Sequence, residues 1–242
     1  GFENPKVRSF IGKNLDRGRF PWLDEETFIL FEKVCLETLR ERNTIEVDGG
    51  VSALRNNFQK RANAVVAGDD GKAIKDAVAF IGSSSTQNKR ALFVGKYARR
   101  VHGVELSRGD VEQILGMLYD FFTQYLGGFF RKRSYLKGES AAFQLNKDIW
   151  KLYPHSDGDV IYRCDSCGCE THLDTGGVCT TLRCEGTMRK MTFAEAYGKD
   201  RYYKDIYREE ALPLAIEEHT AQLSTKQARE IQSGFINGKV NV

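Results

Sequence analysis

The sequence predicts an α+β protein that is mainly helical, in which a winged-helix-like module precedes a four-cysteine zinc ribbon and a helical C-terminal segment. Apolar residues recur at helical spacing over the first half of the chain, and the period becomes that of strands near residue 129. Five of the six cysteines fall between residues 164 and 184. We expect four parts: a helical region (1–106), the winged-helix-like helix and β-hairpin (107–158), the zinc ribbon (159–192) and a helical connector (193–242).

Composition narrows the class of protein. The 242 residues are 41% hydrophobic and 29% charged, which is typical of a soluble globular chain. No apolar run approaches the roughly 18 residues that span a bilayer, and the N-terminus lacks the apolar segment of a signal peptide. We therefore expect a cytoplasmic protein without a membrane partner. The net charge of +3 is small, so an argument for nucleic-acid binding depends on local clusters of basic residues.

The first helix has clear signals. Asp24 is a suitable N-cap, and Glu25 and Glu26 in the first turn favour the positive end of the helix dipole. Its apolar face is expected to contain Phe28, Phe31, Val34, Cys35 and Leu39, with Cys35 acting as a small core residue.

Glycine-rich breaks separate three further predicted helices. The apolar spacing predicts one helix through Leu54, Phe58, Ala62 and Val65, and another through Ile74, Ala77, Val78 and Ile81. A third runs from Thr86 to His102 and ends at Gly103.

The winged-helix prediction depends on the order of the next elements. Ser107 and Asp110 form a capping-box pattern before a broad apolar face that continues to Tyr125. Two predicted strands, 129–135 and 141–146, then surround a turn at 137–139. Helices followed by a basic hairpin are typical of a winged helix. An unspecialised α+β module with a surface hairpin fits the pattern equally well.

The cysteines indicate a structural metal site. Cys164 and Cys167, followed by Gly168, form one zinc knuckle, and Cys179-x4-Cys184 forms the second. Four thiolates would close a tetrahedral zinc site and leave no position for catalytic water. Cys169 is expected to point away, and His172 is a weaker alternative ligand. Free or redox-active thiols, as in a redox sensor, are the other interpretation.

Two clusters of basic residues are candidates for nucleic-acid binding. The alternative for each cluster is a solvated polar face. One cluster lies on the predicted helix 86–102 and the other lies on the hairpin beside aromatic residues, a combination that suits phosphate and base contacts. The helix cluster consists of Lys89, Arg90, Lys96, Arg99 and Arg100. The hairpin cluster consists of Arg131, Lys132, Arg133 and Lys137.

Catalytic motifs are missing from the sequence. Residues 68–73 and 234–240 lack the length and the Ser/Thr of a P-loop, and no DEAH-type box is present. The four histidines pair with no evident nucleophile. We expect the chain alone to be inactive as an ATPase.

The C-terminal third resembles one family. The stretches 202–208 (Tyr-Tyr-x-x-Ile-Tyr-Arg) and 218–224 (Glu-His-Thr-Ala-Gln-Leu-Ser), together with Arg229 and 235–242 (Phe-x-x-Gly-x-x-Asn-Val), are similar to a region of bacterial superfamily 2 DNA helicases. The most similar subgroup is that of the mitomycin-repair and DISARM phage-defence helicases. The resemblance covers about residues 160–242 and implies that 193–242 reach the beginning of a second RecA-like domain. The Walker A motif, motif V proper and the motif VI arginine are absent.

The resemblance implies that the chain is the middle fragment of an ATP-dependent DNA helicase or translocase, inserted between its RecA-like motor domains. Zn²⁺ would be its structural cofactor, whereas ATP and Mg²⁺ would bind only the intact parent. DNA, the motor domains and a repair or defence protein would be its partners. The alternative is a zinc-ribbon adaptor that binds protein without nucleic acid. Polarity, the choice between DNA and RNA, the partner, the pathway and the oligomeric state do not follow from the sequence.

Overall fold

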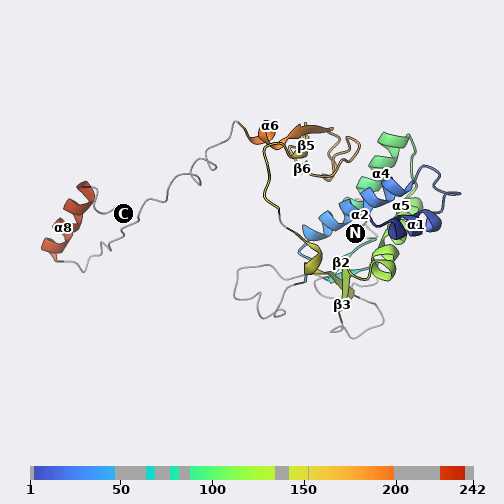
Figure 1. Cartoon of the computed structure of the whole chain (residues 1–242), viewed down its shortest axis with the longest axis horizontal. Helices are drawn as coiled ribbons and strands as arrows, with labels where there is room; N and C mark the ends of the chain where they lie inside the picture. The colour runs from blue at the N-terminus through green and yellow to red at the C-terminus, as the bar shows by residue number, and fades with distance from the viewer. Residues whose placement is uncertain are drawn as a thin grey trace. The chain divides into compact units, whose positions relative to one another are not determined.

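A computed structural model describes residues 3–46, 64–68, 77–81, 88–133, 142–151, 153–198 and 224–237 (Figure 1). Within these residues the fold is mixed α/β, with six α-helices and two small sheets. The chain divides into two compact units, Gly1–Ala196 and Tyr197–Val242, and each is described by itself. None of the helices in the described ranges combines the length and apolar character needed to cross a bilayer.

Four helices form the main body of the first unit, and each begins at a side-chain cap. They are α1 (Pro5–Asn14), α2 (Glu25–Arg40), α4 (Lys89–His102) and α5 (Arg108–Asp120). The predicted cap of α2 is confirmed, because Asp24 accepts a hydrogen bond from the Thr27 amide. The capping box of Ser107 and Asp110 is also confirmed, as is the end of α4 at Gly103, whose φ is +68°.

The core lies where α2 meets the other helices. Phe31 is fully buried in α2 and packs edge-on against Phe93 and Tyr97 of α4, at ring-centroid distances of 5.9 and 5.2 Å. After α5 the chain continues as a π-helix (η2, Phe121–Tyr125), which buries Phe122 under the first sheet. Cys35 is a buried core residue, as predicted.

The first sheet contains the predicted hairpin. β3 (Phe130–Arg133) pairs antiparallel with β4 (Ala142–Leu145), and the turn between them lies outside the described residues. β4 also pairs with β1 (Ala64–Val66), which runs parallel to β2 (Ala77–Ala79), so that the order is β2-β1-β4-β3. The hairpin is therefore part of a four-stranded sheet in which β3 is an edge strand. A short 3₁₀-helix (η3, Lys147–Ile149) follows β4.

Two helix predictions were wrong where the structure describes the residues. Val65 lies in β1, and Ala77 and Val78 lie in β2. All three residues of β1 are buried, so the strand has apolar side chains at successive positions. Such a run matches a helical spacing as well as a strand, and only the neighbouring strands decide between them. Residues 47–63 and 69–76 of these predicted helices lie outside the described residues.

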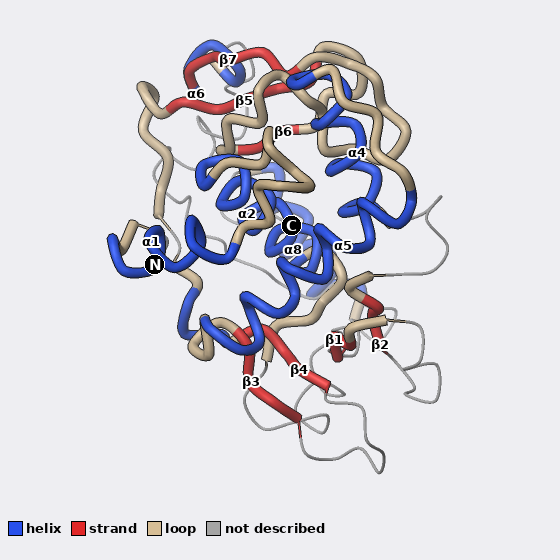
Figure 2. The backbone as a smooth tube through the Cα atoms, turned by 90° about the vertical axis from the view of Figure 1, so that its right-hand side faces the viewer, coloured by secondary structure: helices blue, strands red, loops and turns tan. Residues whose placement is uncertain are grey.

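The second sheet belongs to a part that we call the cysteine module, residues 159–192. β5 (Val160–Cys164) lies between β6 (Glu170–Thr171) and β7 (Met188–Thr192), antiparallel to both. Val178 from the loop between β6 and β7 is fully buried in the main core. Figure 2 shows the module beside α4. The module and the helices therefore share one core, and α6 (Phe193–Tyr197) follows directly after β7.

The predicted helical C-terminal segment is present where the structure describes it. In the second unit, α8 (Thr225–Ile236) begins with a capping box between Ser224 and Gln227. Residues 199–223 and 238–242 lie outside the described residues.

A buried carboxyl group makes the first unit sensitive to pH. Glu32 of α2 has no exposed surface, and neither of its carboxylate oxygens has a hydrogen-bond partner within the described part of the chain. Burial raises the pKa of Glu32 well above its ordinary value, because a charge without partners is costly in an apolar interior. The folded protein thus holds a proton that the unfolded chain releases above about pH 4.3.

Glu32→Gln tests this linkage. The wild type should lose stability as pH rises from about 4.3 toward the raised pKa of Glu32, by up to about 1.4 kcal/mol per pH unit. Gln cannot ionise, so the free energy of unfolding of the variant should match that of the wild type near pH 4 and exceed it at pH 8. Urea unfolding at both pH values measures the difference. If the variant and the wild type differed in stability by the same amount at pH 4 and at pH 8, this result would contradict the burial of an unpaired carboxyl group.

Candidate metal centre

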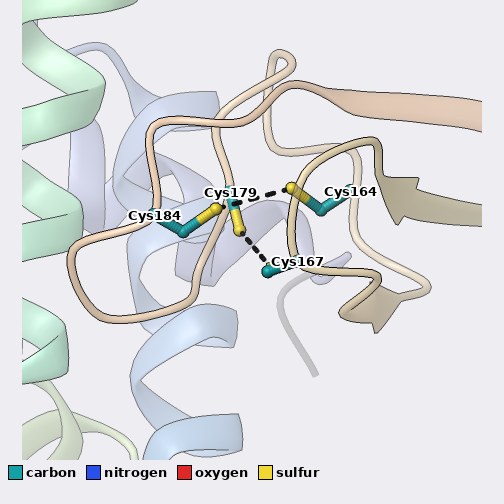
Figure 3. A group of neighbouring side chains, drawn as sticks. All are labelled: Cys164, Cys167, Cys179 and Cys184. Atoms are coloured by element: carbon teal, nitrogen blue, oxygen red, sulfur yellow. Dashed lines mark hydrogen bonds between the residues drawn. The ribbon is translucent and has the colours of Figure 1, made fainter.

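Four cysteine sulfurs lie together at one end of the cysteine module (Figure 3). The Sγ atoms of Cys164, Cys167, Cys179 and Cys184 are all within 4.8 Å of one another. Cys164 and Cys184 are 3.7 Å apart, and Cys167 and Cys179 are 3.6 Å apart. Tetrahedral coordination with metal–sulfur bonds of about 2.3 Å places sulfurs about 3.8 Å apart. The four predicted ligands are thus close enough together to hold one metal ion.

Backbone geometry aims the sulfurs inward. Gly168 has a φ of +70°, as expected for the first knuckle, and its amide donates to the carbonyl of Cys164 at 3.1 Å. In the second knuckle the Thr181 amide donates to Cys179 Sγ and the Gly186 amide donates to Cys184 Sγ, each at 3.4 Å. Such amide–sulfur hydrogen bonds stabilise thiolates and orient ligands around a metal.

The local surroundings shift the pKa of Cys167 and the pKa of Cys179 in opposite directions. The Thr181 hydroxyl, 3.4 Å from Cys167 Sγ, lowers the pKa of Cys167 to about 6. Burial raises the pKa of Cys179, because its thiolate would lack solvent. Metal binding requires the thiols to lose their protons, so the buried Cys179 depends on the charge of the metal for its deprotonation.

Two neighbouring residues were considered as possible members of the site. The expectation that Cys169 points away was wrong: its sulfur lies 3.3 Å from Cys179 Sγ, because the Cys164 amide donates to the carbonyl of Cys169 and closes the turn. Cys169 nevertheless lies outside the group of four mutually close sulfurs. His172 is exposed and stacks on His155, with ring centroids 4.7 Å apart.

Basic side chains of α4 hold the second knuckle, an arrangement that the sequence analysis missed. Lys96 Nζ donates to the carbonyl of Cys184 at 2.6 Å. The Arg100 guanidinium donates to the carbonyls of Glu185 and Gly186 at 3.1 and 3.0 Å. Arg99 forms an ion pair with Glu185 at 3.1 Å. We call Lys96, Arg99 and Arg100 the α4 clamp.

A loop of the module adds an apolar contact to the same helix. Gly176 has a φ of +59°, and a Cβ on it would lie 3.3 Å from Val101 and 3.5 Å from Tyr97. The close approach therefore requires the missing side chain as well as the left-handed backbone. Together with buried Val178, this contact seats the loop on α4.

The other predicted nucleic-acid residues have varied surroundings. Arg90 is only 5% exposed and donates to the carbonyls of Ala79 and Phe80, and Lys89 pairs with Glu41 at 2.6 Å. Lys96 is 8% exposed and so also has little free surface.

On β3, Arg131 pairs with Asp148 at 2.7 Å and with Glu46 at 3.3 Å. Lys132 is exposed and forms no ion pair with a described residue. The side chain of Arg133 and all of Lys137 lie outside the described residues. Nucleic-acid binding by either cluster stays a prediction.

Comparison with protein-family models, with curated proteins and with solved structures finds no match for this chain. Of the residues that carry the resemblance to superfamily 2 helicases, Ser224, Arg229 and Phe235 are described, at or within α8. The remaining ones lie outside the described residues. The resemblance therefore stays a prediction.

Gly186→Ala tests the packing of the knuckles. A Cβ at Gly186 would lie 2.5 Å from Cys164 Sγ and 2.5 Å from Ser166 Cβ, so the two knuckles would have to separate. We expect metal affinity to fall at least about tenfold, as for other changes around metal ligands. Competition with a chromophoric chelator measures it.

Gly158→Ala is the matched control, because a Cβ there meets no atom within 4 Å. It should leave metal affinity unchanged. Equal affinities of the two variants would show that the knuckles do not pack as described.

Proposed function

We propose that the chain is a zinc-stabilised accessory region that contributes nucleic-acid binding and structural coupling to an ATP-dependent DNA helicase or translocase. The observation that carries the proposal is the four-sulfur cluster fixed to the helical core by the α4 clamp. An all-cysteine set with sulfurs 3.6 and 3.7 Å apart favours zinc among the common metals. With four protein ligands, zinc at this site would be structural.

The support for nucleic-acid binding is the edge strand β3. Lys132 is exposed, and the side chain of Arg131 is 46% exposed although it pairs with Asp148 and Glu46. Cations on an edge strand suit contact with phosphates, as in the wing of a winged helix. Asp148 and Glu46 order the side chain of Arg131 and lower its contribution to phosphate binding.

The helicase part of the proposal rests on the resemblance alone. A region inserted between two motor domains must transmit force without deforming. A metal site that joins two knuckles, and is itself joined to a helical core, would meet this requirement. DNA repair and phage defence are the two settings that the resemblance suggests.

A protein-binding adaptor is the second candidate. Much of the predicted basic cluster on α4 is engaged inside the molecule, since Arg90 and Lys96 are buried and Arg100 binds backbone carbonyls. These contacts leave less positive surface for DNA than the sequence suggested. An adaptor would bind through the junction of the helices and the cysteine module.

Elemental analysis tests the metal assignment. We expect one zinc per chain, and Cys184→Ser should lose it together with the stability of the cysteine module, because binding energy here is folding energy. Cys35→Ser is the matched control, since Cys35 is buried in the core away from the cluster and should leave zinc content unchanged. Purified wild type without stoichiometric zinc would contradict the assignment.

Removal of two of the three cations of β3 tests nucleic-acid binding. Arg131→Ala with Lys132→Ala should weaken duplex binding about tenfold at 50 mM salt and lower the salt slope by about one unit per lost phosphate contact. Fluorescence anisotropy at several salt concentrations measures both quantities.

Arg40→Ala with Lys13→Ala removes the same charge from exposed positions on α1 and α2 and should have little effect. If both double variants lost the same amount of DNA affinity, the net charge of the protein alone would account for its attraction to DNA. No binding by the wild type would favour the adaptor.

A further inference from the structure

A pocket of about 360 Å³ lies where α4, α5 and the second knuckle meet. Its volume is within the range of sites that bind ligands or side chains of partners. The apolar part of the lining is aliphatic and comes from Leu92, Leu106, Val111 and Leu115. Arg183 and Glu185, which flank the cysteine Cys184, form the wall on the side of the cysteine module. The module therefore supplies one wall of the pocket, and the helices supply the rest of its lining.

Gly95 lines this pocket from the middle of α4. Glycine inside a helix is destabilising relative to alanine, so its presence needs a reason. A Cβ at Gly95 would meet no heavy atom within 4 Å. The helix backbone is thus open to the pocket, and no neighbouring group of the described chain requires the missing side chain. A bound group that approaches the backbone does provide a reason.

The charges at the rim are partly satisfied. Arg99 pairs with Glu185 at 3.1 Å and Arg108 pairs with Glu112 at 2.7 Å. Arg183 is exposed, has a φ of +58° and forms no ion pair with any described residue. A left-handed conformation is uncommon for a side chain other than glycine or asparagine and is often found at functional sites. The guanidinium of Arg183 is thus a cation available to an external anionic group.

The lining indicates the class of ligand. None of the described residues around the pocket is aromatic, whereas sites for unpaired bases normally offer rings for stacking. An aliphatic surface of this size suits a leucine, isoleucine or methionine side chain. The cation of Arg183 at the rim complements a carboxylate next to that side chain.

We propose that this pocket is the docking site for a peptide segment of a partner protein, which inserts one large aliphatic side chain against Gly95 and places an acidic residue on Arg183. The site goes beyond the proposed nucleic-acid binding and does not depend on it. It gives the adaptor candidate a location and a ligand class.

Selection from a displayed library of random twelve-residue peptides on the intact, metal-loaded chain tests the proposal. We expect enrichment of peptides that carry a large aliphatic residue next to Asp or Glu. Gly95→Leu fills the pocket and should weaken an enriched peptide at least tenfold. Arg183→Glu should weaken it about fivefold or more, because it replaces the attraction for the carboxylate by repulsion.

Gly109→Leu is the matched control, since Gly109 lies in α5 outside the pocket lining and a Cβ there meets only Ser107 Oγ at 3.8 Å. It should bind the peptide as the wild type does. Metal content and melting temperature identify any variant that fails to fold, and Arg183→Glu tests the site even if Gly95→Leu does not fold.

Two outcomes would overturn the proposal. One is that no peptides are enriched, or that the enriched peptides bind the Gly95→Leu and Arg183→Glu variants with the same affinity as the wild type. The other is a shift of the Leu92 and Leu115 methyl resonances on addition of oligo(dT) but not of any enriched peptide, which would assign the pocket to nucleic acid.

Discussion

The hydrogen bond from the Lys96 ammonium to the Cys184 carbonyl is the interaction on which the arrangement of the first unit depends. A buried lysine is costly unless its donors are satisfied, and here the carbonyls of Cys184 and Thr181 accept at 2.6 and 3.4 Å. Both carbonyls belong to the knuckle that carries two of the four sulfurs. The helical core and the metal centre therefore stabilise each other, since a disordered knuckle would leave Lys96 buried without partners.

The same contact would balance the charge of a metal ion bound by the four cysteines. A divalent ion bound by four thiolates carries a net charge of −2, and cations close to the knuckle offset it. The cysteine module has basic residues of its own close to the cysteines in sequence, among them Arg163, Arg183 and Arg189. In the structure, Arg163 and Arg189 pair with Glu170 and Asp165, and the α4 clamp adds cations to the second knuckle, which already contains Arg183. The positive charge of α4 thus serves first to hold the cysteine module.

The sequence predicted those features that local rules determine. Caps, helix ends and knuckles follow from a few adjacent residues, so the caps at Asp24 and Ser107 and the helix end at Gly103 were correctly placed. The four cysteines that were predicted as ligands also lie close together. The pairing of strands that are far apart in the sequence was missed. No local pattern distinguishes β1 from a helix, and its partner β4 follows almost eighty residues later. The function of Lys96 was missed for a related reason. It lies on the face of α4 beside Phe93 and Tyr97, and this position could have indicated burial, but its partner is 88 residues away.

The docked arrangement also separates the two surfaces that could bind partners. The exposed cations of β3 lie on the edge of the first sheet, whereas the pocket at Gly95 lies between α4, α5 and the second knuckle. The pocket wall at Arg183 and Glu185 flanks a metal ligand, so loss of the metal would remove one side of the pocket and leave the pairing of β3 with β4 in place. Metal occupancy would then control peptide docking more strongly than contacts made by the hairpin. The proposed peptide and the proposed nucleic acid would therefore contact different residues, because neither surface is built from residues of the other.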